Sequence, residues 1–372
     1  MRIVFTSGGT GGHIFPIIAV ARQLKKIYGG AEPLEMFFIG SDDGYREVLL
    51  GEEIAVKLIF TGKLRRYFSL WTVLDILKIP IGLIQSFWHL YVLMPDVVFS
   101  KGGGGSICPV FVAWLYRIPV LSHESDAIPG LANQIGAIFS KRLAVSFQSA
   151  ERYFSKKKTA LVGNPIRLKL VQSCLSDNLD KGEKAQSAFN IASQKPVIFI
   201  LGGSQGAEKI NQLILSVLPD LLDKYEVIHQ CGDRNYAGVR GLIRELPANY
   251  HLFPFLNESQ MASAYFLSDL IISRAGAGSI FEIASCAKPS ILIPIPKSPS
   301  DHQRKNAFAY ARAGATSVLE QDNITPHLLL SEISEILDNP AATQKMRENA
   351  KSFSRLEAAD NIARALIEMG RQ

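Results

Sequence analysis

The stretch RIVFTSGGTGGHIFP (Arg2–Pro16) predicts a buried strand that ends in a glycine-rich turn before a helix. Four glycines surround Thr10, so the backbone there can adopt positive φ and a ligand can approach it closely. The helix expected to follow, from about Ile14 to Lys26, points free N–H groups and the positive end of its dipole at that ligand. The stretch therefore predicts a phosphate or pyrophosphate site at the end of the first strand of an α/β fold.

Two common glycine motifs do not fit this turn. The dinucleotide motif G-x-G-x-x-G fails because Ile14 stands where a third glycine should follow Gly9 and Gly11. The P-loop fails because no Gly-Lys-Ser/Thr follows. A simple tight turn is the alternative, but it explains one or two glycines rather than four. His13 comes next, and since a phosphate cradle needs no histidine, it is a candidate for chemistry.

The length of 372 residues predicts two domains, and the apolar fraction of 47% supplies a core for each. The four cysteines, Cys108, Cys174, Cys231 and Cys286, have no paired spacing, so we expect reduced, buried thiols in a cytosolic protein. The chain enters its first strand after one arginine, which leaves no room for a signal peptide.

Short apolar runs alternate with helical stretches throughout the chain, as in parallel α/β sheets. One series of strands is expected at Arg2–Thr6, Met36–Gly40, Val56–Phe60, Val97–Ser100, Val120–Ser122 and Leu143–Val145. A second series is expected at Pro196–Leu201, Glu226–Gln230, His251–Phe253, Leu270–Ser273, Ser290–Ile293 and Thr316–Leu319. Each series would complete a doubly wound sheet, with the domain boundary near Gly163.

The two series begin alike. RIVFTSGGTGG (Arg2–Gly12) and PVIFILGGSQG (Pro196–Gly206) each join a strand to two glycines, a hydroxyl residue and a further glycine before a helix. This weak repeat predicts two nucleotide-fold domains that face each other. A ligand would bind between them, at the carboxyl ends of the strands.

The charge distribution separates the two halves. Residues 1–163 carry 18 Lys and Arg against 12 Asp and Glu, a net charge of +6, whereas residues 164–372 carry 22 of each. An anionic partner of the first half is therefore expected. The sequence contains no nucleic-acid module and no basic–aromatic repeat, which favours an anionic membrane over nucleic acid.

One segment of the first half is unusually apolar. Ile79–Pro95, IPIGLIQSFWHLYVLMP, contains seventeen residues without a charge. It is marginal for a transmembrane helix. Two interpretations remain: a buried core helix, or a surface helix whose apolar face dips into the membrane beside the basic stretch KLRRY (Lys63–Tyr67).

Candidate binding residues follow the strands of the second half. In SRAGAGSIFEI (Ser273–Ile283), Ser279 and Glu282 have the spacing of a capping box, so Glu282 either caps its own helix or accepts hydrogen bonds from both ribose hydroxyls of a nucleotide. Gln303 and Asn306 share a helix face, where two amides suit the hydroxyls of a sugar, although ordinary solvated residues are the alternative.

Seven motifs occur in one order along the chain: GGTGGH, a glycine-rich loop before a proline, H-E-x-x-x-x-P-G, GNP-x-R, GGSQGA-x-x-x-N, R-x-G-x-x-S-x-x-E and H-Q-x-x-N-A. With them the chain closely resembles the MurG family, which adds N-acetylglucosamine to the undecaprenyl-linked muramyl-pentapeptide lipid of peptidoglycan synthesis. The resemblance runs from Arg2 to about Gly314. It implies the α/β GT-B fold, with two doubly wound Rossmann-like domains facing across a cleft. It also implies an acceptor and membrane-facing domain at 1–163, a UDP-sugar domain at 164–340, and a helix region at 341–372 that crosses back to the first domain.

The resemblance also assigns residues. Contacts to UDP-N-acetylglucosamine would fall on Thr10, Gly11, Gly12, Arg167, Ser204, Leu256, Ala277, Gly278, Ser279, Glu282, His302, Gln303 and Asn306. His13 matches a proposed catalytic base, and its place at a helix N-terminus disfavours its charged form. Glu124 and Asp126 are rival bases. No D-x-D motif occurs, and neither a metal nor a cofactor is expected.

The implied reaction is an inverting transfer to the C4 hydroxyl of the muramyl sugar, by a peripheral enzyme on the cytoplasmic face of the bacterial cell membrane. Two acceptor-side motifs depart from the family pattern: GGGSICP (Gly103–Pro109) replaces G-G-Y-V-S-G-P, and HESD (His123–Asp126) replaces H-E-Q-N. Another lipid or a small molecule as acceptor therefore stays open. So do an epimerase and a non-catalytic nucleotide-sugar binding protein on the same fold.

Overall fold

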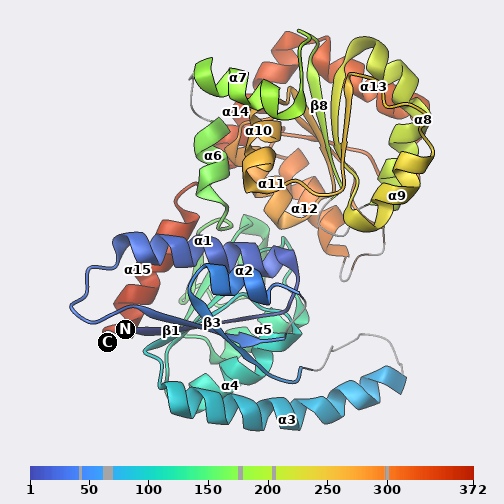
Figure 1. The fold of residues 1–372 in the computed structure, drawn as a ribbon. Helices are drawn as coiled ribbons and strands as arrows, with labels where there is room; N and C mark the ends of the chain where they lie inside the picture. Colours follow the sequence, from blue (N-terminus) through green and yellow to red (C-terminus); the bar gives the residue numbers. More distant parts are fainter. Residues whose placement is uncertain (42–43, 62–69, 175–178, 203–206, 297, 299–300) are drawn as a thin grey trace. The chain divides into compact units, whose positions relative to one another are not determined.

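The computed structural model describes residues 1–372 apart from 42–43, 62–69, 175–178, 203–206, 297 and 299–300 (Figure 1). The chain forms two compact units, the first made of Met1–Ile166 with Arg355–Gln372 and the second of Arg167–Ser354. Each unit is built around one parallel sheet with helices on both faces. The predicted pair of doubly wound α/β domains is confirmed.

The sheet of the first unit has the strand order β3-β2-β1-β4-β5-β6-β7, with every neighbouring pair parallel. Its strands are β1 (Arg2–Ser7), β2 (Glu35–Gly40), β3 (Ile54–Leu58), β4 (Val97–Ser100), β5 (Val120–Glu124), β6 (Arg142–Val145) and β7 (Thr159–Leu161). Strand β1 lies centrally, with Ile3 opposite Met36 on one side and Val97 on the other. The edge strand β7 was not predicted.

In the part of the first unit that the structure describes, six α-helices cover this sheet: α1 (Gly11–Ile27), α2 (Arg46–Gly51), α3 (Leu70–Leu93), α4 (Ile107–Leu115), α5 (Leu131–Phe139) and α15 (Ala358–Gly370). Short 3₁₀ turns lie at Gly104–Ser106 and Gln148–Tyr153. One apolar cluster packs α1, α2 and α15 on one face, and another packs α3, α4 and α5 on the opposite face. Helices on both faces explain why the central strands consist of apolar residues without alternation.

The last helix of the chain belongs to the first unit. Helix α15 lies beside α1 (Figure 1), and its residues Ile362, Leu366 and Met369 recur at helical spacing and are buried. Gly370 lies against Met1, because a Cβ at Gly370 would stand 2.4 Å from Met1 Cε. The two ends of the chain therefore meet within one unit.

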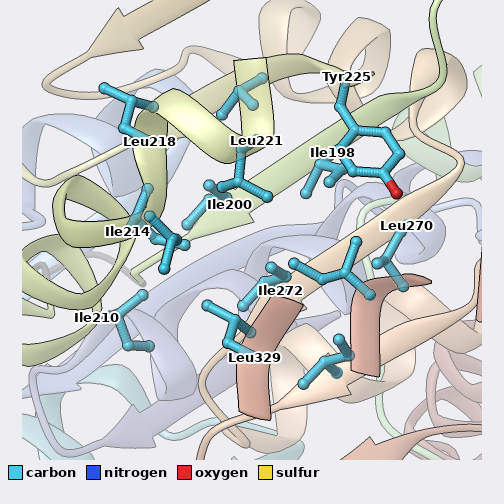
Figure 2. Packing of buried hydrophobic residues seen from close by; sticks show 14 of the residues in the cluster. Ile198, Ile200, Ile210, Ile214, Leu218, Leu221, Tyr225, Leu270, Ile272 and Leu329 are labelled. Carbon is cyan, nitrogen blue, oxygen red and sulfur yellow. The ribbon is translucent and has the colours of Figure 1, made fainter. Parts of the chain in front are cut away.

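The sheet of the second unit has the order β10-β9-β8-β11-β12-β13 and is also parallel. Its strands are β8 (Val197–Leu201), β9 (Glu226–Gln230), β10 (Tyr250–Phe253), β11 (Leu270–Ser273), β12 (Ser290–Leu292) and β13 (Ser317–Val318). Figure 2 shows the core on one face, where Ile198 and Ile200 of β8 pack against Ile214 and Leu221 of the helix that follows.

The helices of this unit are α6 (Leu168–Cys174), α7 (Leu179–Phe189), α8 (Glu208–Lys224), α9 (Asp233–Gly241), α10 (Glu258–Leu267), α11 (Ala277–Ser285), α12 (His302–Ala311), α13 (Pro326–Leu337) and α14 (Pro340–Phe353). Side-chain caps fix several starts. Asn257 and Gln260 form a capping box at α10, while Thr325 and Asn339 cap α13 and α14 ahead of a proline.

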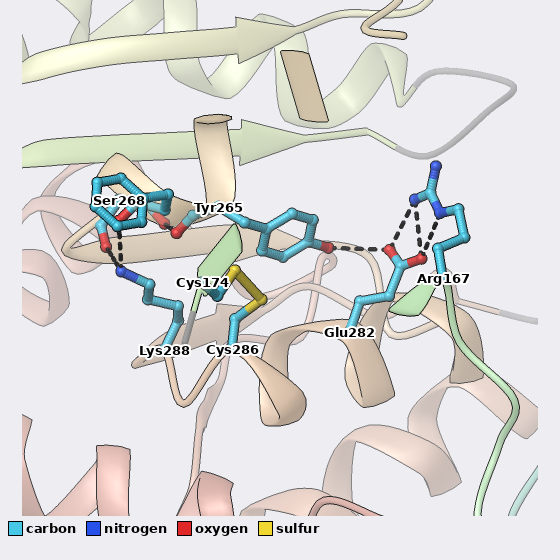
Figure 3. The surroundings of a disulfide bond; sticks show 8 residues. Arg167, Cys174, Tyr265, Ser268, Glu282, Cys286 and Lys288 are labelled. Atoms are coloured by element: carbon cyan, nitrogen blue, oxygen red, sulfur yellow. Dashed lines mark hydrogen bonds and ion pairs between the residues drawn. A yellow bond between two sulfur atoms is a disulfide. The ribbon is translucent and has the colours of Figure 1, made fainter. Parts of the chain in front are cut away.

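A disulfide joins Cys174, at the end of α6, to Cys286, directly after α11 (Figure 3). The prediction of four reduced thiols is therefore wrong for this pair. The two residues are 112 positions apart and meet only because α6 packs against α11, which sequence spacing does not reveal. Cys108 and Cys231 are free and buried, and burial raises the pKa of each thiol to about 11.

Helix α3 contains most of the uncharged segment and lies on the outside of the first unit. Ser86 and Leu90 are buried, whereas Ile84 is 70% and Trp88 64% exposed, with Tyr91 and Val92 exposed on the same side. The alternative of a buried core helix is therefore wrong. Of the helices that the structure describes, none has the length and apolarity needed to cross a membrane. The KLRRY stretch lies outside the described residues.

Candidate functional site

Two glycine loops meet at the carboxyl edge of the first sheet, after β1 and β4, where the strand order reverses. The Gly8 N–H donates to the Gly102 carbonyl over 2.7 Å. Gly102 and Gly103 both have φ of +82°, and a Cβ on Gly103 would stand 2.7 Å from the Gly8 nitrogen. Only glycine allows this close contact, so the loops are fixed against each other.

His13 occupies the first turn of α1, beside these loops. Thr10 is the N-cap residue, and its hydroxyl oxygen lies 2.7 Å from Nδ1 of His13. A Cβ on Gly103 would stand 3.5 Å from Cε1 of the imidazole. Gly11 is buried, while Thr10 and Gly12 are exposed. Thr10 thus holds a half-buried imidazole at the loop junction.

Glu124 is the last residue of β5 and is buried. Its Oε1 accepts from the Asp126 N–H over 2.8 Å, and its Oε2 accepts from the Gly130 N–H over 3.1 Å and from Asn133 Nδ2 over 2.8 Å. Burial raises the pKa of Glu124 to about 7. Both oxygens are therefore engaged in ordering the loop that carries the half-buried Asp126.

Lys101, directly after β4, was missed in the sequence. It is 1% exposed, and its ammonium donates to the Ser125 hydroxyl beside Glu124. The only sequence signal was its position, between the apolar strand VVFS and a run of glycines. Burial of a lysine depends on neighbouring loops, which the pattern does not show.

In the second unit, Arg167 forms a bidentate ion pair with Glu282 (Figure 3). Nε lies 2.9 Å from Oε1 and Nη2 lies 3.0 Å from Oε2, and the Tyr265 hydroxyl donates to Oε2 over 3.3 Å. Helix α11 begins after Gly276, which puts Ser279 at its third position rather than at the cap. The capping-box interpretation of Glu282 is therefore wrong. Tyr265 lies within α10, and no sequence signal marked it.

The first turn of α11 carries Ala277, Gly278 and Ser279, and Gly276 precedes it as the N-cap residue. Asn306 is fully buried beneath this turn, and its amide donates to the Ala275 carbonyl over 3.3 Å. An amide that is buried in this way supports the loop. The N–H groups of a first helical turn are available to an anion.

The loop after β12 is braced in a similar way. Oε1 of the half-buried Gln303 accepts from the Ile295 N–H over 3.1 Å, and the Gln303 N–H donates to the Ser298 hydroxyl over 3.3 Å. His302 is half-buried at the start of α12. Ser204, which the family resemblance assigns to UDP-N-acetylglucosamine binding, lies outside the described residues.

Leu256 lies in the loop after β10 and is fully buried. Its N–H donates to Oε1 of Gln230, the last residue of β9, over 3.1 Å. The side chain of Gln230, which the sequence did not mark as a site residue, therefore holds the loop that contains Leu256. The carboxyl ends of β9, β10, β11 and β12 lie along one edge of this sheet, so the site residues of the second unit gather there.

Family comparisons match both halves of the chain. Residues 3–145 match the glycosyltransferase family 28 N-terminal domain, and residues 197–362 match the glycosyltransferase family 28 C-terminal domain. The chain is also 24% identical to the Acinetobacter baumannii MurG structure, with a TM-score of 0.73 over 99% of both chains. A UDP-GlcNAc 2-epimerase from Neisseria meningitidis bound to UDP-GlcNAc shares the fold at 15% identity and a TM-score of 0.69, over 99% of this chain and 100% of the epimerase.

Curated relatives extend over nearly the same length. The chain is 34% identical over 369 residues, 99% of both proteins, to UDP-N-acetylglucosamine–N-acetylmuramyl-(pentapeptide) pyrophosphoryl-undecaprenol N-acetylglucosamine transferase 2 of Bacillus thuringiensis subsp. konkukian. It is 39% identical over 342 residues to the transferase of that name from Legionella pneumophila strain Paris, covering 90% of this chain and 88% of the relative. The chain therefore belongs to the MurG group of glycosyltransferase family 28.

Proposed function

We propose that the protein transfers N-acetylglucosamine from UDP-N-acetylglucosamine to the C4 hydroxyl of the muramyl sugar of undecaprenyl-pyrophosphoryl-MurNAc-pentapeptide, with inversion at the anomeric carbon. The observation that carries this proposal is the 34% identity, over 99% of the chain, to the Bacillus thuringiensis N-acetylglucosamine transferase described above. The lipid acceptor and product, lipid I and lipid II, belong to peptidoglycan synthesis.

The donor site that we propose lies at the carboxyl edge of the second sheet. Glu282 accepts hydrogen bonds from the ribose hydroxyls, using lone pairs that remain beside its contacts to Arg167 and Tyr265. The Leu256 backbone contacts the uracil. The first turn of α11, together with Ser204, holds the diphosphate, where N–H donors stabilise the leaving group as negative charge develops.

The sugar-facing residues in this proposal come from the loop after β12 and the start of α12. Gln303 contacts the sugar hydroxyls through Nε2, since its Oε1 already holds Ile295. His302 lies beside it at the first position of the helix. Asn306 acts through the Ala275 carbonyl, because it is buried and braces the loop from beneath.

The base that we propose is His13, which removes the proton from the attacking hydroxyl. Thr10 orients the imidazole through Nδ1. In this proposal Nε2 is the nitrogen that accepts the proton. Asp126 stays the rival, because it is half-buried at the loop that Glu124 orders. Glu124 itself has three hydrogen bonds to its carboxylate and is better suited to hold the loop.

We further propose that the protein docks peripherally on the cytoplasmic face of the cell membrane through α3. The acceptor's undecaprenyl chain stays in the bilayer, so the enzyme must reach its sugar from the surface. The exposed side of α3 presents Ile84, Trp88, Tyr91 and Val92. Residues 1–163 also carry the whole positive excess of the chain, which favours anionic lipid.

The proposed function is tested by incubating the purified protein with labelled UDP-N-acetylglucosamine and lipid I. We expect one label per lipid, with one UDP released for each. Parallel reactions replace lipid I by diacylglycerol or omit the acceptor. Transfer only to another acceptor would contradict the proposed acceptor, and UDP release without any acceptor would favour the epimerase.

A further inference from the structure

A buried ammonium ion lies beneath the acceptor-side loops of the first unit. The side chain of Lys101 is fully enclosed. Transferring an ammonium ion out of water is unfavourable unless nearby charges and hydrogen bonds compensate it. An apolar residue could fill the same space without the free-energy cost of burying a charge. The groups that surround the Lys101 ammonium therefore indicate its role.

The compensation comes from the loop after β5. The Lys101 ammonium donates to the Ser125 hydroxyl, which in turn donates to Oδ1 of Asn164 over 3.2 Å. The carboxylates of Glu124 and Asp126 lie close enough to favour its charged form. Lys101 is therefore the positive centre of a turn that otherwise contains two negative charges.

The backbone that follows Lys101 also contacts the glycine loop that precedes His13. Gly102 follows Lys101 in the chain and accepts a hydrogen bond from Gly8. Gly103 comes next and lies against the His13 imidazole. A movement of the Lys101 ammonium would thus disturb the glycine loop before His13 on one side and the Ser125–Asp126 turn on the other.

We propose that Lys101 is a positioning residue for the transfer reaction, which fixes the Ser125–Asp126 turn against the glycine loop that precedes His13. It does not touch substrate, because it is enclosed. It acts through the two candidate bases and the acceptor-facing backbone between them. This inference goes beyond the donor and base assignments, and its kinetic test rests on the proposed function.

The charge of Lys101 allows its positioning role to be measured through the pH dependence of the reaction. Burial lowers the pKa of Lys101 to about 8, against the opposing effect of the two carboxylates. Burial, and then Asp126, raise the pKa of Glu124 to about 7, against its hydrogen bonds and the Lys101 ammonium. Both groups are charged between these values. Burial and the ammonium lower the pKa of His123, so that this ring stays neutral there.

The test is Lys101→Met, which keeps the length of the side chain and removes its charge. We expect kcat to fall roughly tenfold to a hundredfold, because misplacement of catalytic groups by about 1 Å has that effect. The dissociation constant of UDP-N-acetylglucosamine should stay unchanged. The wild-type rate should decline above about pH 8 as Lys101 loses its proton. The variant should lack that decline, which a merely structural role would not predict.

Lys158→Met is the matched control. Lys158 is a partly buried lysine of the same unit, whose ammonium donates to the carbonyls of Ala137 and Ser140. It lies just before β7, at the amino end of the parallel strands, whereas Lys101 lies at their carboxyl end. We expect it to lower the melting temperature without altering the pH profile. A wild-type kcat and an unaltered alkaline decline in Lys101→Met would overturn the inference.

Two further measurements apply if Lys101→Met misfolds or if no transfer activity can be measured. The double variant Lys101→Met/Glu124→Gln removes both charges, so it should fold and still show the lowered kcat. Full activity of this variant would refute a positioning role. Amide hydrogen exchange over residues 125–130 needs no substrate and should be faster in Lys101→Met. Unchanged exchange would reject the inference even if lipid I proved not to be the acceptor, whereas absent wild-type transfer alone would reject only the proposed function.

Discussion

Glu282 shows how one side chain combines structure and binding. Its carboxylate already holds the half-buried Arg167 guanidinium through two short contacts. Removing one partner of such a pair leaves an uncompensated charge, at a cost of roughly 3–5 kcal/mol for a buried pair. The substitution must therefore keep a polar group at this position if binding is to be separated from stability.

We predict that Glu282→Gln weakens UDP binding by roughly tenfold to a hundredfold, because hydrogen bonds to a charged acceptor contribute about 1.5–3 kcal/mol. Isothermal titration with UDP measures this change. Tyr265→Phe is the control, since it removes only the 3.3 Å hydroxyl contact and should alter affinity far less. Equal effects of the two substitutions would contradict a ribose contact for Glu282.

His13 permits a second test at the same scale. We predict that His13→Ala lowers kcat by about 100-fold to 10,000-fold, the usual range for loss of a general base. Single-turnover kinetics and donor titration should show the loss almost entirely in turnover. Thr10→Val should have a smaller effect, since it removes only the 2.7 Å contact to Nδ1. Equal losses in turnover and donor affinity would reduce His13 to a binding residue.

At the scale of elements, α6 and α11 are fastened at two points. Arg167, just before α6, binds Glu282, and Cys174, at the end of α6, is bonded to Cys286 (Figure 3). Glu282 and Cys286 are four residues apart, so they lie on the same face of α11 and its continuation. The disulfide therefore helps to hold α6 alongside the residue that we propose for the ribose.

We predict that reduction of this disulfide lowers the free energy of unfolding of the second unit by about 2–4 kcal/mol. Urea unfolding with and without dithiothreitol measures the difference. The variant Cys174→Ser/Cys286→Ser should match the reduced protein. Replacing Cys108 and Cys231 with alanine should preserve the sensitivity to dithiothreitol. Alkylation of all four cysteines in the unreduced, denatured protein would show that the bond does not form.

The sequence predicted the strands well because each is a short apolar run between helical segments, as in VVFS before Lys101. The edge strand β7 escaped because Thr159–Leu161 is only three residues long and is not fully buried. The disulfide and the Arg167–Glu282 pair escaped for another reason. They depend on how α6 packs, and no local pattern encodes a contact between residues more than a hundred positions apart.

The candidate site divides in a similar way. Glycine spacing and strand ends marked His13, Glu124 and the α11 loop. The buried partners Gln230 and Tyr265 carried no signal, and Lys101 carried only its position after VVFS, because a polar residue inside the fold looks like any surface residue in the sequence. The hydrogen-bond partners of Gln303 and Asn306 depend on how the loops after β11 and β12 fold, which the sequence pattern does not show.

For the molecule as a whole, the first unit combines the positive excess of the chain with the exposed apolar side of α3. We predict that Ile84→Ser/Trp88→Ser weakens binding to anionic vesicles about tenfold or more, since burying such side chains contributes about 1.5–3 kcal/mol each. Vesicle sedimentation measures binding, and added salt should weaken it in the wild type.

Leu242→Ser is the control for this prediction, because Leu242 is 75% exposed on the second unit. It should leave vesicle binding unchanged, and all three proteins should bind UDP equally. Wild-type protein that fails to sediment with anionic vesicles at low salt would contradict docking. So would a double variant that sediments as the wild type does.

The return of α15 to the first unit has a consequence for biosynthesis. Strands β1 to β7 leave the ribosome first, but the apolar groove that receives Ile362, Leu366 and Met369 stays open until the final residues emerge. At about 5–20 residues per second, the roughly two hundred residues after Ile166 take about 10–40 s to synthesise. The second unit is continuous and can complete its fold during that time. A premature stop codon near the end of the message would therefore leave the earliest-made half of the protein unfinished, as a target for chaperones and proteases.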